Sequence, residues 1–271
     1  DEGDEALYPN PGYPEYEAAA YFAGAKPIPY RLTIEDEFRV DPDKLAELIT
    51  PKTKLVVINT PHNPCGSIMS KEEVKALVDL AIDHGFYILS DEVYRPFLYD
   101  GEQHHSPLEV TKSLDQIIIA DGFSKRYAMT GWRLGYAVAS EEIIKDMNKI
   151  QSHSVSHPTS FVQYAGVTAL KGDQSCVDEM VSAFKRRRDK IISGLDKLGI
   201  EYIYPKGAFY IFMKVRDGTE FAERFLKEEY VAVTPGEAFG SYKDYVRVSY
   251  ATSDQNISEF LKRLGRFMEK F

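Results

Sequence analysis

Three short apolar runs mark the first half of the chain, at residues 55–58, 86–89 and 117–120. Each is continuous rather than alternating and is rich in β-branched or aromatic side chains, which is typical of strands in a parallel sheet covered on both faces. After the first run, Ser70 and Glu73 form a capping-box pattern, apolar residues follow at helical spacing, and Gly85 marks a helix end. The pattern predicts a strand–helix–strand unit within an α/β domain.

The second half of the chain has a different texture. A strand is predicted at 135–139, and then helices at 141–153, 160–171 and 174–198, a strand-like stretch at 202–215, a helix near 219–229, a strand at 245–250 and a final helix from Ser253. We therefore expect an α/β three-layer sandwich with a mainly parallel sheet in residues 1–172 and a smaller α+β domain in residues 173–271. The boundary is placed at Gly172-Asp173.

Composition excludes several classes of protein. A formal net charge of −9 argues against binding to nucleic acid, and no apolar run approaches the ~20 residues that a membrane span needs. The basic run at 185–188 lies within a helical pattern and is read as a solvated helix face. Cys65 and Cys176 are far apart and in no metal-like spacing, so we expect a cytoplasmic protein with no disulfide framework and no metal site.

Polar segments follow each of the three strands. They are 59–66 (NTPHNPCG), 90–94 (SDEVY) and 121–125 (DGFSK). Taken singly, these segments have ordinary explanations: a tight turn, a helix cap and a surface charge. Because ligands of open α/β sheets bind beyond the carboxyl ends of the strands, their convergence predicts one functional crevice.

The stretch 122–135, GFSKRYAMTGWRLG, resembles the lysine signature of the fold-type I pyridoxal-phosphate enzymes, specifically the class I/II, aspartate aminotransferase-like enzymes. Supporting matches are Pro11-Gly12-Tyr13-Pro14, Pro61-His62-Asn63-Pro64-Cys65-Gly66, Asp91-Glu92-Val93-Tyr94 and Val246-Arg247-Val248-Ser249, and the resemblance covers essentially the whole chain. Thr60 and Cys65 depart from the commonest pattern as small, tolerated variations. The resemblance implies an aminotransferase that moves an amino group between an amino acid and a 2-oxo acid, using pyridoxal 5'-phosphate.

The resemblance also implies roles for single residues. Lys125 would form the Schiff base with the cofactor and then carry the proton between substrate and cofactor. Asp91 would pair with the pyridinium nitrogen. Asn63 and Tyr94 would hydrogen-bond the cofactor's phenolate oxygen, and Tyr13 would stack on its ring. For Tyr13, an ordinary buried tyrosine beside a turn is a serious alternative.

Further implied contacts concern anions and a partner subunit. Arg133, with Ser124 as a second contact, would hold the cofactor phosphate. Arg247, together with Asn63, would bind the substrate α-carboxylate, although an arginine in an alternating strand is more often a solvated residue. The resemblance implies a homodimer with the active site at the interface.

Several alternatives stay open at this point. A β-lyase or a decarboxylase on the same scaffold would use the same cofactor, and an inactive or truncated ligand-binding fragment would use none of its chemistry. The family's N-terminal arm and phosphate-binding turn precede the point that matches Asp1, so we expect an N-terminally truncated chain that binds the cofactor weakly. An aspartate-type substrate follows only from overall resemblance. Residues 151–157 (QSHSVSH) contain no arginine to bind a distal carboxylate, and an aromatic substrate stays open.

Overall fold

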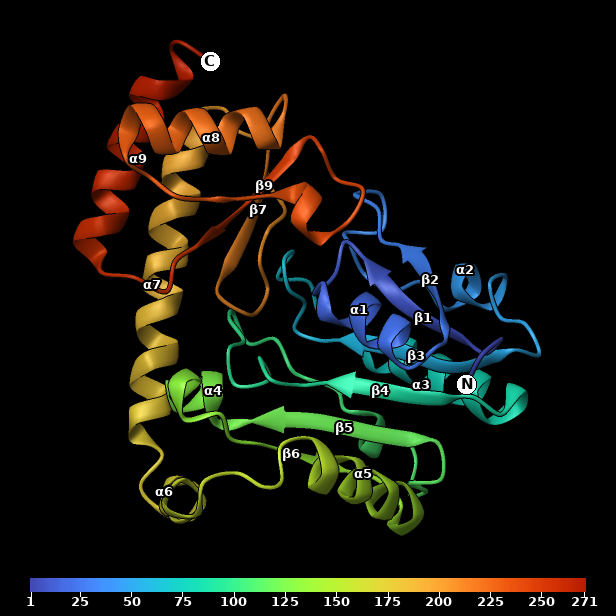
Figure 1. The fold of residues 1–271 in the computed structure, drawn as a ribbon. Helices are drawn as coiled ribbons and strands as arrows, with labels where there is room; N and C mark the ends of the chain where they lie inside the picture. The colour runs from blue at the N-terminus through green and yellow to red at the C-terminus, as the bar shows by residue number, and fades with distance from the viewer.

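A computed structural model describes all 271 residues as two sheets surrounded by helices (Figure 1). The first sheet has the order β2-β1-β3-β4-β5-β6, in which all neighbours are parallel except β5 and β6. Its strands are β1 (Glu5–Asn10), β2 (Lys26–Arg31), β3 (Thr53–Asn59), β4 (Tyr87–Asp91), β5 (Ile117–Gly122) and β6 (Gly135–Val138). The three strands predicted from apolar runs are confirmed as β3, β4 and β5, and they are adjacent.

The capping box predicted after β3 is also confirmed. Helix α3 (Lys71–His84) begins after Ser70, whose hydroxyl accepts from the Glu73 backbone N–H, while the Glu73 carboxylate accepts from the Ser70 N–H at 2.6 Å. Gly85 ends the helix with φ 75°, a left-handed conformation that glycine adopts at little cost.

The remaining helices include those predicted at 141–153, 160–171, 174–198, near 219–229 and from Ser253, which are confirmed, and three shorter ones in the first half of the chain that the sequence pattern did not predict. They are α1 (Glu15–Phe22), α2 (Pro42–Ala46), α4 (Phe123–Arg126), α5 (Glu141–Ser154), α6 (Ser160–Lys171), α7 (Ser175–Lys197), α8 (Gly218–Glu229) and α9 (Asp254–Met268), with short 3-10 turns η1 (Pro107–Glu109), η2 (Thr130–Trp132) and η3 (Gly236–Phe239). In Figure 1, α7 runs along the molecule from α6 to the second sheet. No helix is both long enough and apolar enough to cross a lipid bilayer.

The second sheet has the order β7-β9-β8, with β7 (Tyr210–Lys214), β8 (Thr234–Pro235) and β9 (Tyr245–Ser249) all antiparallel to their neighbours. The strand-like stretch predicted at 202–215 is thus only partly a strand; an isolated bridge joins Tyr202 to Met213 ahead of it. Because side chains alternate between faces, Ile211 and Val248 enter the core formed with α7 and α9, whereas Arg247 lies on the other face.

The basic run on α7 is not a wholly solvated face. Arg188 is 1% exposed and lies between the rings of Tyr99 and Tyr204, at 4.6 and 5.3 Å from their centroids. Its guanidinium pairs with Asp189 and Asp100, which satisfies the buried charge. A helical period alone cannot reveal this, because the two tyrosines come from distant loops.

Apolar packing crosses the predicted domain boundary. Phe38, from the loop after β2, contacts Phe212 of β7 and Tyr245 of β9, with ring centroids 6.1 and 5.9 Å apart. All three belong to the cluster that also contains Leu7 and Ile88 of the first sheet. We retain residues 1–172 and 173–271 as a proposed division, with a substantial apolar interface between them.

Candidate active site

The predicted crevice is a pocket of about 470 Å³ at the carboxyl ends of β3, β4 and β5. Every predicted site residue lines it, namely Tyr13, Asn63, Asp91, Tyr94, Ser124, Lys125, Arg133 and Arg247. The lining also includes residues to which the sequence pattern assigned no role, namely Tyr16, Asn59, Asp121, Thr130 and Tyr210, of which Asn59 and Asp121 lie within the predicted polar segments. The polar segments after the three strands therefore do converge, and the second sheet contributes Arg247 and Tyr210 to the same pocket.

Asp91 is the last residue of β4, and both of its carboxylate oxygens are held. The Tyr16 hydroxyl donates to Oδ2 at 2.6 Å, and the Val93 backbone N–H donates to Oδ1 at 3.2 Å. Burial raises the pKa of this carboxyl, and the bonds from Tyr16 and Val93 partly oppose that shift. Asp91 therefore has a fixed orientation, and a neighbouring cation would stabilise its ionised form.

Lys125 lies in α4, which begins directly where β5 ends. Its Nζ lies 5.8 Å from the centroid of the Tyr94 ring and 5.9 Å from that of Phe209, and no carboxylate is within 4 Å. Burial, and then the nearby Arg247 charge, lower the pKa of the amine, while Asp91 opposes this. A lowered pKa increases the fraction of neutral amine, which is the nucleophilic and basic form.

Asn63 is placed by the turn that follows β3. Its backbone N–H donates to Asn59 Oδ1 at 2.9 Å, and Asn59 Nδ2 donates to the Asp91 carbonyl at 3.0 Å. Asn59 thus ties the end of β3 to the end of β4. The Asn63 side-chain oxygen in turn accepts from Arg247 Nη1 at 2.9 Å.

Arg247 crosses from the second sheet into this pocket. Its guanidinium lies between the rings of Tyr210 and Phe239, with Cζ at 4.4 and 4.6 Å from the centroids. Nη2 donates to Thr234 at 3.4 Å, and Nε is buried without a hydrogen-bond partner. With donors left over and no carboxylate within 4 Å, the side chain is suited to bind a carboxylate ligand.

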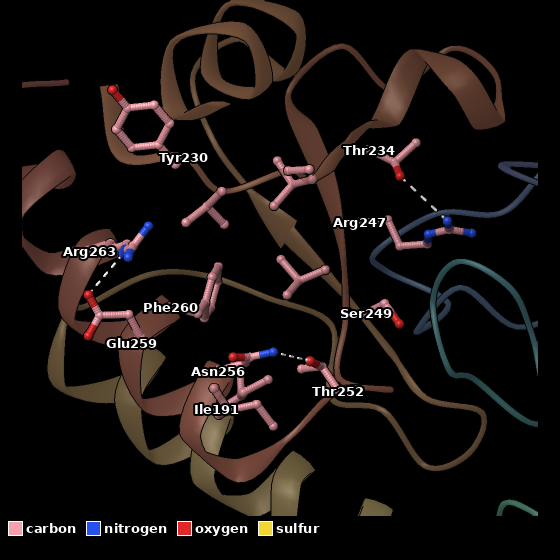
Figure 2. Close-up of a pocket in the computed structure, with 15 residues that line it drawn as sticks. Ile191, Tyr230, Thr234, Arg247, Ser249, Thr252, Asn256, Glu259, Phe260 and Arg263 are labelled. Atoms are coloured by element: carbon pink, nitrogen blue, oxygen red, sulfur yellow. Dashed lines mark hydrogen bonds and ion pairs between the residues drawn. The ribbon is translucent and has the colours of Figure 1, made fainter. Parts of the chain in front are cut away.

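A second hollow of about 470 Å³ lies within the C-terminal part of the chain (Figure 2). It is lined by residues of α9 such as Phe260 and Arg263, by the segment around Thr234, and by β9. Figure 2 shows the Arg247 side chain extending from β9 with its Thr234 bond marked, while Glu259 and Arg263 pair with each other. Most of its polar side chains pair with one another, and Arg247, which lines both hollows, also reaches Asn63 in the first pocket, so the catalytic chemistry gathers there.

Arg133 lies on the exposed side of the pocket. It adopts a left-handed conformation with φ 53°, its Nη1 donates to the Thr130 carbonyl at 3.0 Å, and it has no carboxylate partner within 4 Å. Ser124 and Thr130 line the pocket beside it. An unpaired guanidinium next to two hydroxyls fits a phosphate group.

Tyr13 is 41% exposed, so it is not the buried tyrosine of the alternative reading. It lies edge-on to Tyr16, with ring centroids 5.6 Å apart, and lines the pocket. Asp121, by contrast, already has a cationic partner: Arg95 Nη2 lies 3.4 Å from its Oδ2, whereas Asp91 has no ion pair. Asp91 is then the pocket carboxylate left to meet a cationic ring nitrogen, and the set of donors fits pyridoxal phosphate.

His104 lies in the loop between β4 and η1 and is buried there. Its side chain is 6% exposed and lies 3.0 Å from Glu92, which directly follows Asp91. Glu92 also accepts from Ser106 at 2.6 Å and from Ser90 at 3.2 Å. This buried network holds the segment after β4 in place, and no metal-like cluster is present.

The chain is also similar to known proteins over its whole length. The family model described as aminotransferase class I and II matches residues 1–264. The chain belongs to this family. It is 38% identical to aromatic-amino-acid aminotransferase 2 of Thermococcus litoralis and 40% identical to aspartate aminotransferase of Bacillus subtilis, covering 99% and 100% of this chain and 71% of each relative.

Solved structures agree. The aromatic aminotransferase of Pyrococcus horikoshii OT3 superposes with a TM-score of 0.96 at 39% identity, covering all of this chain and 74% of the other. The aspartate aminotransferase of Thermotoga maritima gives 0.95 at 38% identity, covering 100% and 71%. The chain is therefore an aminotransferase of a pyridoxal-phosphate-dependent family, and this favours amino transfer over the β-lyase and binding-fragment alternatives.

Proposed function

We propose that the pocket binds pyridoxal 5'-phosphate and that Lys125 is the catalytic amine for transfer between an amino acid and a 2-oxo acid. The observation that carries this proposal is the placement of Lys125, Asp91 and Arg133 around one pocket, with both cations free of carboxylate partners. The cofactor, when bound, supplies a ring that withdraws electrons from the substrate Cα.

The protein's part in holding the cofactor can be assigned residue by residue. Asp91 meets the ring nitrogen, and its two fixed hydrogen bonds keep it aimed there. Arg133 and Ser124 take the phosphate, Asn63 and Tyr94 the phenolic oxygen, and Tyr13 one face of the ring. Burial raises the pKa of the Tyr94 hydroxyl well above its usual range, so Tyr94 keeps its proton and acts as a donor.

Proton movement falls to Lys125. Its amine, neutral in a larger fraction because burial and Arg247 lower its pKa, would carry the proton between the substrate Cα and the C4′ atom of the cofactor. Arg247 holds the α-carboxylate with the donors that Asn63 and Thr234 leave free. Retention of the carboxylate by this arginine favours amino transfer over decarboxylation.

For the substrate, we propose the aspartate type, on the basis of the relatives named aspartate aminotransferase. An aromatic substrate is the second candidate, because a relative of similar identity is an aromatic-amino-acid aminotransferase. Segment 151–157 adds histidines but no arginine. The steady-state preference between aspartate and phenylalanine decides between the two.

We also propose that the face formed by α5 and α6 binds a second copy of the chain. Ile150, Val155, Phe161 and Tyr164 are 71%, 67%, 67% and 77% exposed on it. An apolar surface of this kind is characteristic of a protein–protein contact. A hollow of about 740 Å³ on this face shares Arg133 with the active-site pocket, so a partner here would lie beside the cofactor.

The test uses covalent trapping. After incubation with pyridoxal phosphate and reduction with borohydride, we expect the peptide containing Lys125 to carry the cofactor, as read by mass spectrometry. Lys125→Ala should lose the label, whereas Lys145→Ala, an exposed lysine on α5, should retain it. A change of the visible absorption from the pyridoxal form to the pyridoxamine form of the cofactor on adding L-aspartate would support amino transfer. Release of pyruvate and ammonia from a β-substituted amino acid would point instead to a lyase.

A further inference from the structure

Tyr210 contacts two separate parts of the site, Arg247 of the second sheet and Tyr94 after β4. It is 6% exposed and is the first residue of β7. In the antiparallel register Phe212 lies opposite Arg247, and Tyr210 lies opposite Ser249. Residues directly opposite each other share a face, so Tyr210 and Arg247 are diagonal neighbours on the face toward the pocket.

The ring of Tyr210 is one wall of the Arg247 site. The guanidinium carbon lies 4.4 Å from its centroid, with Phe239 at 4.6 Å as a second wall. A guanidinium on an aromatic face is stabilised by a cation–π interaction, and two faces restrict its rotation. The donors of Arg247 are thereby directed toward Asn63 and the pocket.

The hydroxyl of Tyr210 reaches the other part of the site. It lies 3.0 Å from the Tyr94 hydroxyl, and this pair is buried. A hydroxyl has one proton and two lone pairs, so Tyr94 can donate elsewhere only if Tyr210 is the donor within the pair. Donation by Tyr210 would also strengthen the bond that Tyr94 makes onward.

We propose that Tyr210 is a positioning residue that links the two halves of the site: its ring orients Arg247 for the substrate carboxylate, and its hydroxyl directs the Tyr94 proton to the cofactor phenol. This rests on the proposed function. It assigns to one side chain of the second sheet two separable effects, one on carboxylate affinity and one on the cofactor's ionisation.

The experiment uses cofactor-loaded enzyme with two variants and two readouts. Tyr210→Phe keeps the ring and removes the hydroxyl, while Tyr210→Leu removes both. The first readout is the pH midpoint of the cofactor's visible absorption band, which rises when the cofactor phenolate loses stabilisation. The second is the Kd of 2-methylaspartate, an unreactive amino acid with an intact α-carboxylate and no hydrogen at Cα.

Tyr210→Phe should raise the midpoint by about 0.5 pH unit, because one hydrogen bond acting through Tyr94 is lost, and should leave the Kd nearly unchanged. Tyr210→Leu should raise the midpoint similarly and weaken 2-methylaspartate roughly 10-fold, because the cation–π wall is lost. Ile211→Val, which truncates the next residue of β7 on the opposite face, controls for simple packing loss and should change neither readout.

A midpoint that falls or stays fixed in Tyr210→Phe would overturn the hydroxyl's role, since a fall means that Tyr94 donates to Tyr210. An unchanged Kd in Tyr210→Leu would overturn the role of the ring. If the parent enzyme itself does not bind 2-methylaspartate, the aspartate-type substrate fails instead, and the KM of the accepted amino acid replaces the Kd.

Discussion

Substitution of Tyr16 by Phe removes one hydrogen bond and little else. The hydroxyl donates to Asp91 Oδ2 at 2.6 Å, a short distance typical of a bond to a charged acceptor. Such bonds contribute about 1.5–3 kcal/mol net. Because Val93 still donates to the other oxygen, we take the lower end of that range. Asp91 would then stabilise a protonated ring nitrogen less well, and kcat should fall about 10-fold.

The assay is steady-state transamination with cofactor in excess. We expect the loss to appear in kcat and in cofactor affinity, with KM for the amino acid within about 2-fold, because Arg247 and Asn63 are untouched. Tyr21→Phe serves as the control, since Tyr21 lies on the same helix and is 67% exposed. A kcat within 2-fold of the parent enzyme, or a defect confined to KM, would refute the assignment of Tyr16 to Asp91.

Three further outcomes are expected. Asp100 accepts hydrogen bonds from Lys185, Arg188 and Tyr204, and these bonds, led by that from Lys185, lower its pKa to about 2. The ionised Asp100 carboxylate therefore stabilises the folded state at pH values above its usual pKa of about 4. This stabilisation is lost as the pH falls toward the lower pKa that Asp100 has in the folded state. Asp100→Asn should therefore cost about 1 kcal/mol at pH 7 in urea titrations and flatten the dependence on pH below 4; an unaltered acid transition would contradict this. Gly66→Ala should cost at least about 2 kcal/mol in thermal unfolding, because φ is +72° and a Cβ would lie 2.9 Å from the Gly207 carbonyl. Gly101→Ala, at φ +81° with nothing within 4 Å, should cost only about 1 kcal/mol, and equal losses would show that strain alone matters. Phe161→Asp, at a side chain 67% exposed on α6, should yield a monomer in sedimentation equilibrium, whereas Leu226→Asp on α8 should not; a dimer in both would exclude this face.

The strand ends of the first sheet could be predicted because the residues that define them are adjacent in the sequence. Each strand is a continuous apolar run, and each polar segment follows it at once, so parallel pairing alone brings Asn63, Asp91 and Lys125 together. Tyr16 could have been found as well. It lies three residues after Tyr13, in the first turn of α1, and its ring contacts that of Tyr13, which precedes the helix.

Tyr210 and Arg188 depend on contacts that a single sequence does not encode locally. Tyr210 reaches Arg247 through the β7–β9 register, and reaches Tyr94 across the interface between the two parts of the chain. Arg188 appears as one more charge in a basic run until the loops that carry Tyr99 and Tyr204 are placed around it. Period and composition predict which face of an element is apolar, but not which distant side chain meets its polar face.

The apolar packing of Phe38 against the second sheet has a consequence for cooperativity. A proteolytic nick in the loop between α6 and α7 would not release two stable pieces, because Phe212, Tyr242 and Tyr245 would lose the ring of Phe38 and face water. The two halves should therefore melt in a single transition, with amide exchange in β7 and in β3 slowed to the same limiting rate.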